Sequence, residues 1–281
     1  MGFAAEATDR QRLTTEGKRP AGALTLRSVA DELDWGDGDY GRTARTLQPV
    51  AEVVIDAAEI ARGEHVLDVA CGTGNAALVA HDAGAIVTGL DRSRRLLEVA
   101  RRRVPGAEFV RGDAAELPFD DGRFDAAVSV FGVIFARPAE QAAAEIARVV
   151  RPQGRVVITT WPPRGPMFAA VSLMRQALAR KRPPDEEGAP LEWGDPSVLK
   201  TLLGPYGAAE ISERQLVHER STPEEFWDRW ERLHPMWIAA RSQLEPADWE
   251  RLREDAIAAL RDGAIDAGAT SPYLLAVLER S

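Results

Sequence analysis

The feature that most constrains the fold is a short apolar run that leads directly into a glycine-rich turn. Residues 66–75 read Val-Leu-Asp-Val-Ala-Cys-Gly-Thr-Gly-Asn, and a helical pattern follows over Asn75–Ala83. Gly72 and Gly74 allow the backbone to approach a ligand closely, and the N-terminus of the following helix offers unpaired N–H groups. The pattern therefore predicts a strand, a ligand-binding turn and a helix, in that order.

Short apolar runs and helical stretches go on alternating as far as residue 161. We expect strands at His65–Val69, Ile86–Leu90, Ala107–Arg111, Phe124–Val130 and Arg155–Trp161. We expect helices at Thr43–Ala61, Asn75–Ala83, Ser93–Arg103 and Pro138–Val150. Buried strands that alternate with helices predict a parallel sheet covered on both faces, which is a doubly wound α/β domain.

The alternation weakens after Trp161. Helices are expected at about Met167–Arg180 and Pro196–Leu203, followed by strands at Ala209–Arg220 and Tyr273–Leu278 that are separated by a helical block, Pro223 to Arg261. We interpret the two strands as a sheet edge and the helical insertion, residues 222–262, as a lid over the ligand end. Residues 1–21 are expected to form a tail. The domain is then 22–281, with a cofactor half at 43–161 and the lid and sheet edge at 162–281.

Composition argues against several classes of protein. The chain has 35 basic and 44 acidic side chains, a net charge of −9, which argues against a nucleic-acid binder. Its single cysteine allows no intrachain disulfide, and the histidines show no zinc-site spacing. The longest nearly apolar run, Ala126–Ala136, is far shorter than the roughly 18–20 residues needed to cross a bilayer. We expect a cytoplasmic protein with no metal and no membrane partner.

Acidic residues stand at the ends of three successive expected strands. Asp68 precedes the glycine-rich turn, where a carboxylate would repel a pyrophosphate but suits a cationic ligand. Asp91 is placed to accept both hydroxyls of a ribose, although an aspartate here could also simply begin a helix. Asp113 and the adjacent backbone N–H could read an adenine, although an ordinary turn aspartate gives the same pattern.

Five motifs stand in order along the chain: Asp68–Asn75, Gly89–Asp91, Gly112–Phe119, Phe124–Asp125 and Arg148–Gly154. Together they resemble the class I S-adenosylmethionine-dependent methyltransferases, in particular those of ubiquinone and menaquinone biosynthesis. The resemblance covers about Trp35 to Trp161. It implies a Rossmann-like, seven-stranded, mostly parallel sheet, with S-adenosylmethionine as cofactor and S-adenosylhomocysteine as product.

The resemblance also implies roles for individual residues. The methionine part of the cofactor would be lined by Asp68, Ala70, Gly72 and Gly74, with Cys71 and Asn75 in the same turn. Asp91 would hold the ribose, and the adenine side would be formed by Arg92, Leu96, Asp113 and Ala114. Ser129 would lie near the sulfonium, and Tyr40 is a candidate clamp over the cofactor's carboxylate or methyl group. Two positions depart from the family pattern, because Ala70 and Gln153 stand where glycine is frequent.

Methyl transfer from a sulfonium is an in-line displacement, which requires the reacting atoms to be held collinear and about 3–3.5 Å apart. A phenol, hydroxyl or carbon acid also needs a base. His218 and His234 are the candidates for that base, and surface or packing histidines are the plainer interpretation of both. The acceptor is expected near the exits of the fourth and fifth strands, beside Phe131, Phe135 and Trp161.

Two clusters allow a structural interpretation as well as a functional one. Trp227, Trp230 and Trp237 fall on nearly one helical face, with Trp249 further on, which predicts either a core seam between lid helices or an aromatic wall for a substrate. The arginines at 92, 94, 95 and 101–103 are typical of a solvated helix face in a net-acidic chain.

The leading hypothesis is a methyltransferase that modifies an O, N or C atom of a small aromatic or apolar molecule, such as a secondary metabolite. An NAD-dependent oxidoreductase is a second reading, disfavoured by Asp68 and by the lack of a Tyr-x-x-x-Lys pair. A ligand-binding protein or cyclase on the same fold is a third, since fold does not determine function. The oligomeric state stays open, with a homodimer as one alternative.

Overall fold

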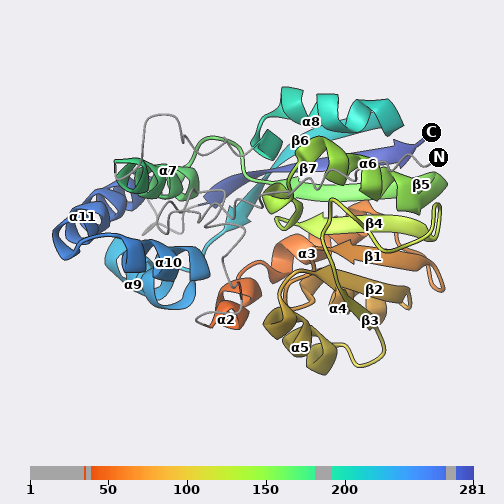
Figure 1. Cartoon of the computed structure of the whole chain (residues 1–281), viewed down its shortest axis with the longest axis horizontal. Coiled ribbons are helices and arrows are strands. Elements are labelled where there is room, and N and C mark those ends of the chain that lie inside the picture. Colours follow the sequence, from red (N-terminus) through yellow and green to blue (C-terminus); the bar gives the residue numbers. More distant parts are fainter. Residues whose placement is uncertain (1–34, 36–38, 181–191, 264–269) are drawn as a thin grey trace, which may run out of the picture.

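The computed structural model describes residues 35, 39–180, 192–263 and 270–281 (Figure 1), so the predicted tail at 1–21 lies outside the described residues. Within these ranges a seven-stranded sheet has the order β3-β2-β1-β4-β5-β7-β6. Its strands are β1 His65–Val69, β2 Ile86–Asp91, β3 Glu108–Arg111, β4 Phe124–Val130, β5 Val150–Thr160, β6 Gly207–Val217 and β7 Thr270–Arg280. β7 is antiparallel to both β5 and β6, and the other pairs are parallel. The doubly wound, mostly parallel sheet predicted from the sequence is confirmed.

The order of the strands reverses at β1. From β1 the chain proceeds outward through β2 to β3, and then returns to β4 on the other side of β1. In open α/β sheets, ligands bind in the crevice outside the carboxyl ends of the strands at such a switch point. The glycine-rich turn follows β1 directly, so it lies at this crevice.

Helices cover both faces of the sheet. α3 Gln48–Ala57, α4 Asn75–Asp82 and α5 Arg94–Arg103 pack on one face, and α6 Ala139–Val149 and α8 Pro196–Leu203 on the other. Alternate residues of β1 divide between the two cores, since Val66 packs with α4 whereas Leu67 and Val69 pack with α6. Short 3-10 turns lie at Val133–Phe135, Glu192–Gly194 and Gly204–Tyr206.

The single helix expected at Thr43–Ala61 is wrong. The structure has two helices there, α2 Tyr40–Arg45 and α3 Gln48–Ala57. Pro49 lies in the first turn of α3, where its missing N–H costs nothing. Inside one continuous helix it would have no N–H to donate to the carbonyl four residues earlier. The apolar spacing runs on across this break, so periodicity alone did not reveal it.

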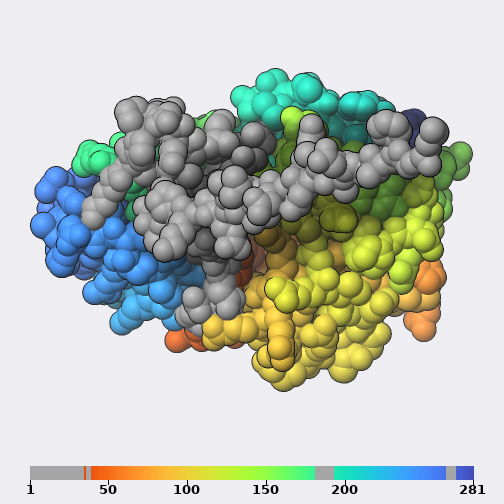
Figure 2. All heavy atoms as spheres, viewed as in Figure 1, coloured from red at the N-terminus to blue at the C-terminus, as the bar shows by residue number. Residues whose placement is uncertain are grey.

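The lid helices form a lobe beside the sheet (Figures 1 and 2). α9 Pro223–Leu233, α10 Pro235–Gln243 and α11 Pro246–Asp262 lie between β6 and β7 in the chain and pack with α7 Pro166–Ala179. Trp227 and Trp237 lie at the centre of that core, 0% and 1% exposed, with ring centroids 4.7 Å apart. The lid tryptophans therefore form the core seam, one of the two interpretations that the sequence allowed.

None of the helices in the described part of the chain is long and apolar enough to span a membrane.

Candidate cofactor and acceptor site

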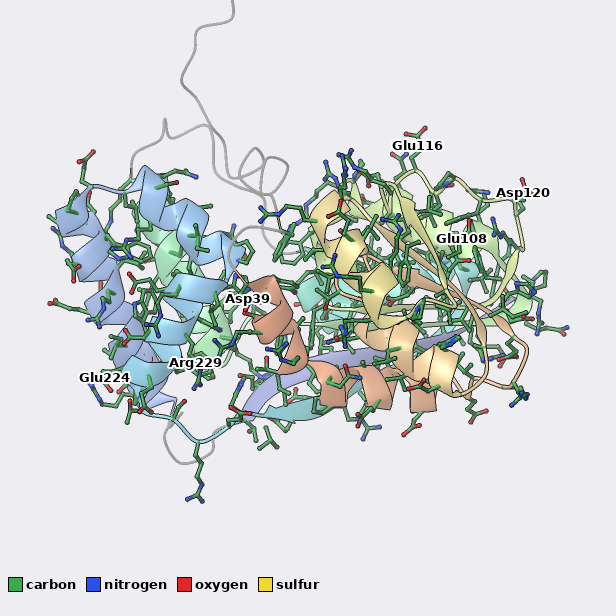
Figure 3. All side chains as sticks on the ribbon, turned by 90° about the horizontal axis from the view of Figure 1, so that it is seen from below. Asp39, Glu108, Glu116, Asp120, Glu224 and Arg229 are labelled. Carbon is green, nitrogen blue, oxygen red and sulfur yellow. The ribbon has the colours of Figure 1, made fainter. Side chains whose placement is uncertain are left out.

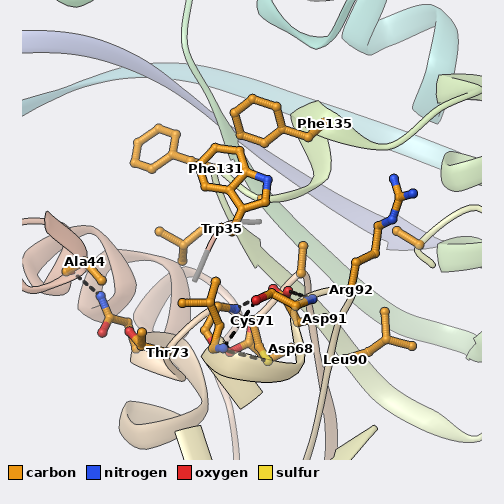
Figure 4. A pocket seen from close by; sticks show the side chains of 18 of the residues that line it. Trp35, Ala44, Asp68, Cys71, Thr73, Leu90, Asp91, Arg92, Phe131 and Phe135 are labelled. Carbon is orange, nitrogen blue, oxygen red and sulfur yellow. Dashed lines mark hydrogen bonds between the residues drawn. The ribbon is translucent and has the colours of Figure 1, made fainter. Parts of the chain in front are cut away.

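A cavity of about 370 Å³ opens at the C-terminal ends of β1, β2 and β4 (Figure 4). Most residues that the sequence singled out line it, namely Tyr40, Asp68, Ala70, Cys71, Gly72, Asn75, Asp91, Arg92, Leu96, Asp113, Ala114, Phe131 and Phe135. Five others lie outside its lining: Gly74, Ser129, Trp161, His218 and His234. The predicted positions thus converge on one site, and their contacts with a ligand remain predictions.

The two glycines of the turn have different tasks. Both have left-handed backbone, with φ of 54° at Gly72 and 79° at Gly74, a conformation that side chains disfavour. Gly72 lines the cavity. Gly74 is the N-cap of α4, and a Cβ there would lie 3.2 Å from the Cβ of Ala100, so this glycine lets α4 pack closely on α5. Cys71, which precedes Gly72, is buried, and burial raises the pKa of its thiol well above the ordinary value.

Asp68 is a buried carboxylate at the base of the turn. Its side chain is 2% exposed, and Oδ2 accepts a hydrogen bond from the backbone N–H of Ala77, 2.9 Å away in the first turn of α4. Burial raises the pKa of Asp68 to about 7, and the negative charge of Asp91 adds to this. A cation next to Asp68 would stabilise its ionised form.

Asp91 joins the end of β2 to the glycine-rich turn. One carboxylate oxygen accepts from the backbone N–H of Gly72 and the other from that of Ser93, both at 2.8 Å (Figure 4). Ser93, not Asp91, caps α5, because its hydroxyl accepts from the N–H of Leu96. Burial raises the pKa of Asp91 above its usual range. Two buried carboxylates in one cavity suit a ligand that carries positive charge.

The ends of β1 and β4 carry strained backbone at the cavity wall. Ala70 and Phe131 have positive φ angles of 53° and 57°, although neither is glycine. Phe131 is held there because its N–H donates to Oγ1 of Thr159 at 3.1 Å. Strained residues of this kind are typical of ligand sites, where the surrounding structure holds them in place.

Arg103 organises the turn from outside the cavity. One of its terminal nitrogens donates to the carbonyl and hydroxyl of Thr73, at 2.7 and 3.0 Å, and to Oδ1 of Asn75 at 2.8 Å. Asn75 in turn donates to the carbonyl of Ala44 at 2.6 Å (Figure 4). The side chain of Asn75 is therefore engaged within the protein. The solvated face predicted for this arginine run holds for Arg102, whereas Arg103 is half-buried and structural.

Asp113 both closes a turn and faces the cavity. Oδ1 accepts from the N–H of Ala115 at 2.9 Å, which is the turn role that the sequence also allowed. Oδ2 lies 3.7 Å from the guanidinium of Arg92, and both residues line the cavity. Leu96 and Ala114 supply apolar surface at the same end.

The opposite end of the cavity is aromatic. Trp35 lies next to Phe135 and Tyr40, with ring centroids 4.7 and 5.6 Å away, and Figure 4 shows it between the two phenylalanines and the carboxylates. Trp161 is stacked on Phe131 at 3.9 Å and 5°, outside the lining. Trp161 therefore supports the wall, and its predicted contact with substrate would have to be indirect.

Ser129 is buried outside the lining. Its hydroxyl donates to the carbonyl of Val69 at 2.7 Å and accepts from the N–H of Val133 at 3.1 Å. These bonds tie β1 to the turn after β4. The hydroxyl is occupied by backbone, and its contact with the cofactor stays a prediction.

Neither candidate base lines the cavity. Nε2 of His218 lies 2.7 Å from the hydroxyl of Ser271 at the base of the lid. Nδ1 of His234 accepts from the N–H of Met236 at 3.3 Å, although its ring reaches Tyr40 and Trp35. Burial lowers the pKa of each histidine to about 4. Both are therefore neutral packing histidines in this structure, and a role for either as a base is not supported by its contacts.

Sequence reasoning missed three contributors to the site. Trp35 precedes α2, the first helix among the described residues, and belongs to no periodic pattern. Gly132 lacks a motif, and Arg103 was grouped with its solvated neighbours. Each has a partner far along the chain, namely Phe135 for Trp35, Ala70 for Gly132 and Thr73 for Arg103, which local sequence patterns do not reveal.

Comparisons with known proteins agree with this geometry. A family profile described as a methyltransferase domain matches residues 67–158. An uncharacterised protein of Mycobacterium tuberculosis is 36% identical over 197 residues, which cover 68% of this chain and 69% of that protein. A demethylmenaquinone methyltransferase of Paenarthrobacter aurescens is 34% identical over 231 residues, 74% of this chain and 89% of that one. The structure of a geranyl diphosphate C-methyltransferase from Streptomyces coelicolor, a complex with S-adenosylhomocysteine, superimposes with a TM-score of 0.52 at 19% identity, over 83% and 79% of the two chains.

The chain therefore belongs to the class I S-adenosylmethionine-dependent methyltransferases. It transfers a methyl group from this cofactor to a small molecule. The residues present fit the cofactor, because its positively charged sulfur and ammonium groups suit a cavity that holds the buried carboxylates of Asp68 and Asp91.

Proposed function

We propose that the acceptor is a small aromatic or otherwise apolar metabolite, methylated on an O, N or C atom. The observation that carries this proposal is the change of character along one cavity. One end holds the carboxylates of Asp68 and Asp91, and the other is bordered by the rings of Trp35, Phe131 and Phe135 (Figure 4). A cationic cofactor suits the first end and a flat apolar ring suits the second.

The chain's own residues act by orientation. S-adenosylmethionine, when bound, supplies a methyl group on a positively charged sulfur. The wall residues then need to hold the acceptor in line with that group, with the reacting atoms about 3–3.5 Å apart. Phe131 is a stiff wall for this purpose, because its backbone is tied to Thr159 and its ring is stacked on Trp161.

The hydrogen bonding of the histidines favours acceptors that need little help from a base. Nδ1 of His234 already accepts a backbone N–H, so its lone pair is engaged. Tyr40 lies between the aromatic end and the glycine-rich turn and carries an ionisable group, and burial together with the charge of Asp91 raises its pKa to about 12. An acidic phenol, an enol carbon or an amine can react without a strong base. The similarity to a demethylmenaquinone methyltransferase supports a quinone-like ring as the first acceptor to try.

The test is to incubate the protein with S-adenosylmethionine and single acceptors, and to look for products heavier by one CH₂. The panel contains hydroquinones, phenols and aromatic amines, with aliphatic amines and sugars as polar controls. We expect product from at least one flat aromatic acceptor, no product with Asp91→Ala, and a raised KM for that acceptor with Phe135→Ala. Product from the polar controls alone would contradict the proposed acceptor class. A change of the acceptor without a gain of CH₂ would favour the cyclase alternative.

A further inference from the structure

The elbow between the first two lid helices is formed by one residue. The backbone N–H of His234 donates to the carbonyl of Trp230 at 2.9 Å, which ends α9. Its side-chain Nδ1 accepts from the N–H of Met236 at 3.3 Å, which begins α10. Because Nδ1 is the acceptor, the ring proton lies on Nε2, and the imidazole is a neutral aromatic ring.

The ring of His234 faces residues that line the cavity. The centroids of Tyr40 and Trp35 each lie 5.9 Å from the imidazole, at interplanar angles of 79° and 73°. Edge-to-face pairs at this distance are attractive, and they place the two partner rings relative to the imidazole. The lid therefore contacts the cavity wall through an aromatic cluster.

α2 is held from both sides by this arrangement. On the side of the turn, Asn75 donates to the carbonyl of Ala44, and a Cβ at Gly72 would lie 3.8 Å from the ring of Tyr40. On the other side, His234 packs on Tyr40. Figure 3 shows α2, with Asp39 at its start, between the lid helices and the sheet. Tyr40 is thus enclosed between the glycine-rich turn and the lid elbow.

We propose that His234 is a positioning residue for the cofactor end of the cavity: its ring holds Tyr40 over the glycine-rich turn, so that the lid and the cofactor site are coupled. This inference rests on the proposed function and on the predicted role of Tyr40 as a clamp over the cofactor. Coupling of this kind is reciprocal, so the bound cofactor also steadies the lid elbow.

Two substitutions separate the ring of His234 from its capping role. His234→Asn keeps a side-chain acceptor for the N–H of Met236 but removes the aromatic contacts, whereas His234→Phe keeps a ring and removes the cap. Thr222→Ala is the matched control, because Thr222 caps α9 and its hydroxyl bonds only within the lid, to the N–H of Glu225. Dissociation constants for S-adenosylhomocysteine and melting temperatures are measured for all three and for the wild type.

We expect His234→Asn to weaken S-adenosylhomocysteine binding about five- to tenfold. His234→Phe and Thr222→Ala should lower the melting temperature by about 2–4 °C and leave the dissociation constant within about twofold. Amides of residues 41–45 should exchange hydrogen faster in His234→Asn than in His234→Phe, with and without ligand.

Wild-type affinity in His234→Asn, or a loss of affinity that follows the melting temperature across the three variants, would overturn the positioning role. Failure of the wild type itself to bind S-adenosylhomocysteine would instead refute the cofactor assignment. In that case, hydrogen exchange of the α2 amides in the two His234 variants, measured without ligand, still decides whether His234 holds this helix.

Discussion

A Cβ built on Gly132 would lie 2.5 Å from the Cβ of Ala70, so these two residues share one small space between the ends of β1 and β4. Ala70 has left-handed backbone and stands where the family often has glycine. Its extra methyl group is accommodated because Gly132 has none. The departure at Ala70 is therefore matched by a glycine from the neighbouring strand end.

Gly132→Ala should consequently be strongly unfavourable. The new methyl group would meet both the Cβ and the carbonyl oxygen of Ala70, at 2.5 and 2.6 Å. We expect the free energy of unfolding to fall by about 1–3 kcal/mol in urea titrations, as is usual for overpacking. An unchanged urea midpoint would show that the backbone around Ala70 moves to make room for the new methyl group, which would contradict this prediction.

Gln153→Gly should stabilise the protein. Gln153 is exposed and has a φ of 62°, so its side chain contributes strain and little packing. Relief of the strain exceeds the extra entropy of glycine in the unfolded chain, which gives a gain of about 0.5–1 kcal/mol. Ala61→Gly, at an exposed loop position, is the control and should be slightly destabilising. An equal decrease in the free energy of unfolding in both variants would argue against strain at Gln153.

Asp68→Asn should raise the free energy of unfolding and weaken binding of the cofactor. The folded-state pKa of Asp68 is about 7, above the roughly 3.9 of an unfolded chain. Between these pH values the folded state binds the proton more often, so the stability contributed by Asp68 is lost as the pH rises. Asparagine carries no charge and still accepts from the N–H of Ala77. We expect a free energy of unfolding higher by roughly 2–4 kcal/mol at pH 8 and by less than about 1 kcal/mol at pH 4.

The same variant should bind S-adenosylmethionine at least about tenfold more weakly, because it lacks a negative charge beside the cationic ligand. Thermal unfolding and calorimetric titration at the two pH values check both halves. If the gain in free energy of unfolding over the wild type is smaller at pH 8 than at pH 4, the burial of a charged Asp68 is contradicted.

Arg103→Met should weaken cofactor binding although Arg103 lies outside the cavity lining. The substitution leaves the carbonyl of Thr73 and the amide oxygen of Asn75 without their donor, which loosens the turn. We expect a loss of about tenfold in affinity for S-adenosylhomocysteine. Arg102→Met removes the same charge from the exposed side of α5 and should bind normally. Equal effects of the two variants would mean that only net charge matters.

The local sequence pattern predicted the strands that position the site. It predicted less well the side chains that hold these strands and their turns in place. The bounds of β1 and β4 agree with the expected His65–Val69 and Phe124–Val130, because strands buried on two faces give short apolar runs. The strand predicted at Arg155–Trp161 runs from Val150 to Thr160, because Val150 already pairs with Phe124 of β4. Residues 151–154 interrupt the register before the pairing resumes at Arg155.

Residues that act through distant partners could not be found in this way. Arg103 bonds to residues 28 and 30 positions earlier in the chain, so nothing in its helix distinguishes it from Arg102. Trp35 packs against Phe135 and His234, which lie far along the chain. His234 looked like a candidate base by residue type, and its hydrogen bond to Met236 became visible only with the fold.

The most direct test of the cofactor site is calorimetric titration of the wild type and of Asp91→Ala with S-adenosylhomocysteine, with NADH as a control ligand. We expect micromolar binding of S-adenosylhomocysteine by the wild type, loss of that binding in Asp91→Ala, and no heat with NADH. Unchanged S-adenosylhomocysteine binding by the variant, or binding of NADH in its place, would contradict the cofactor assignment.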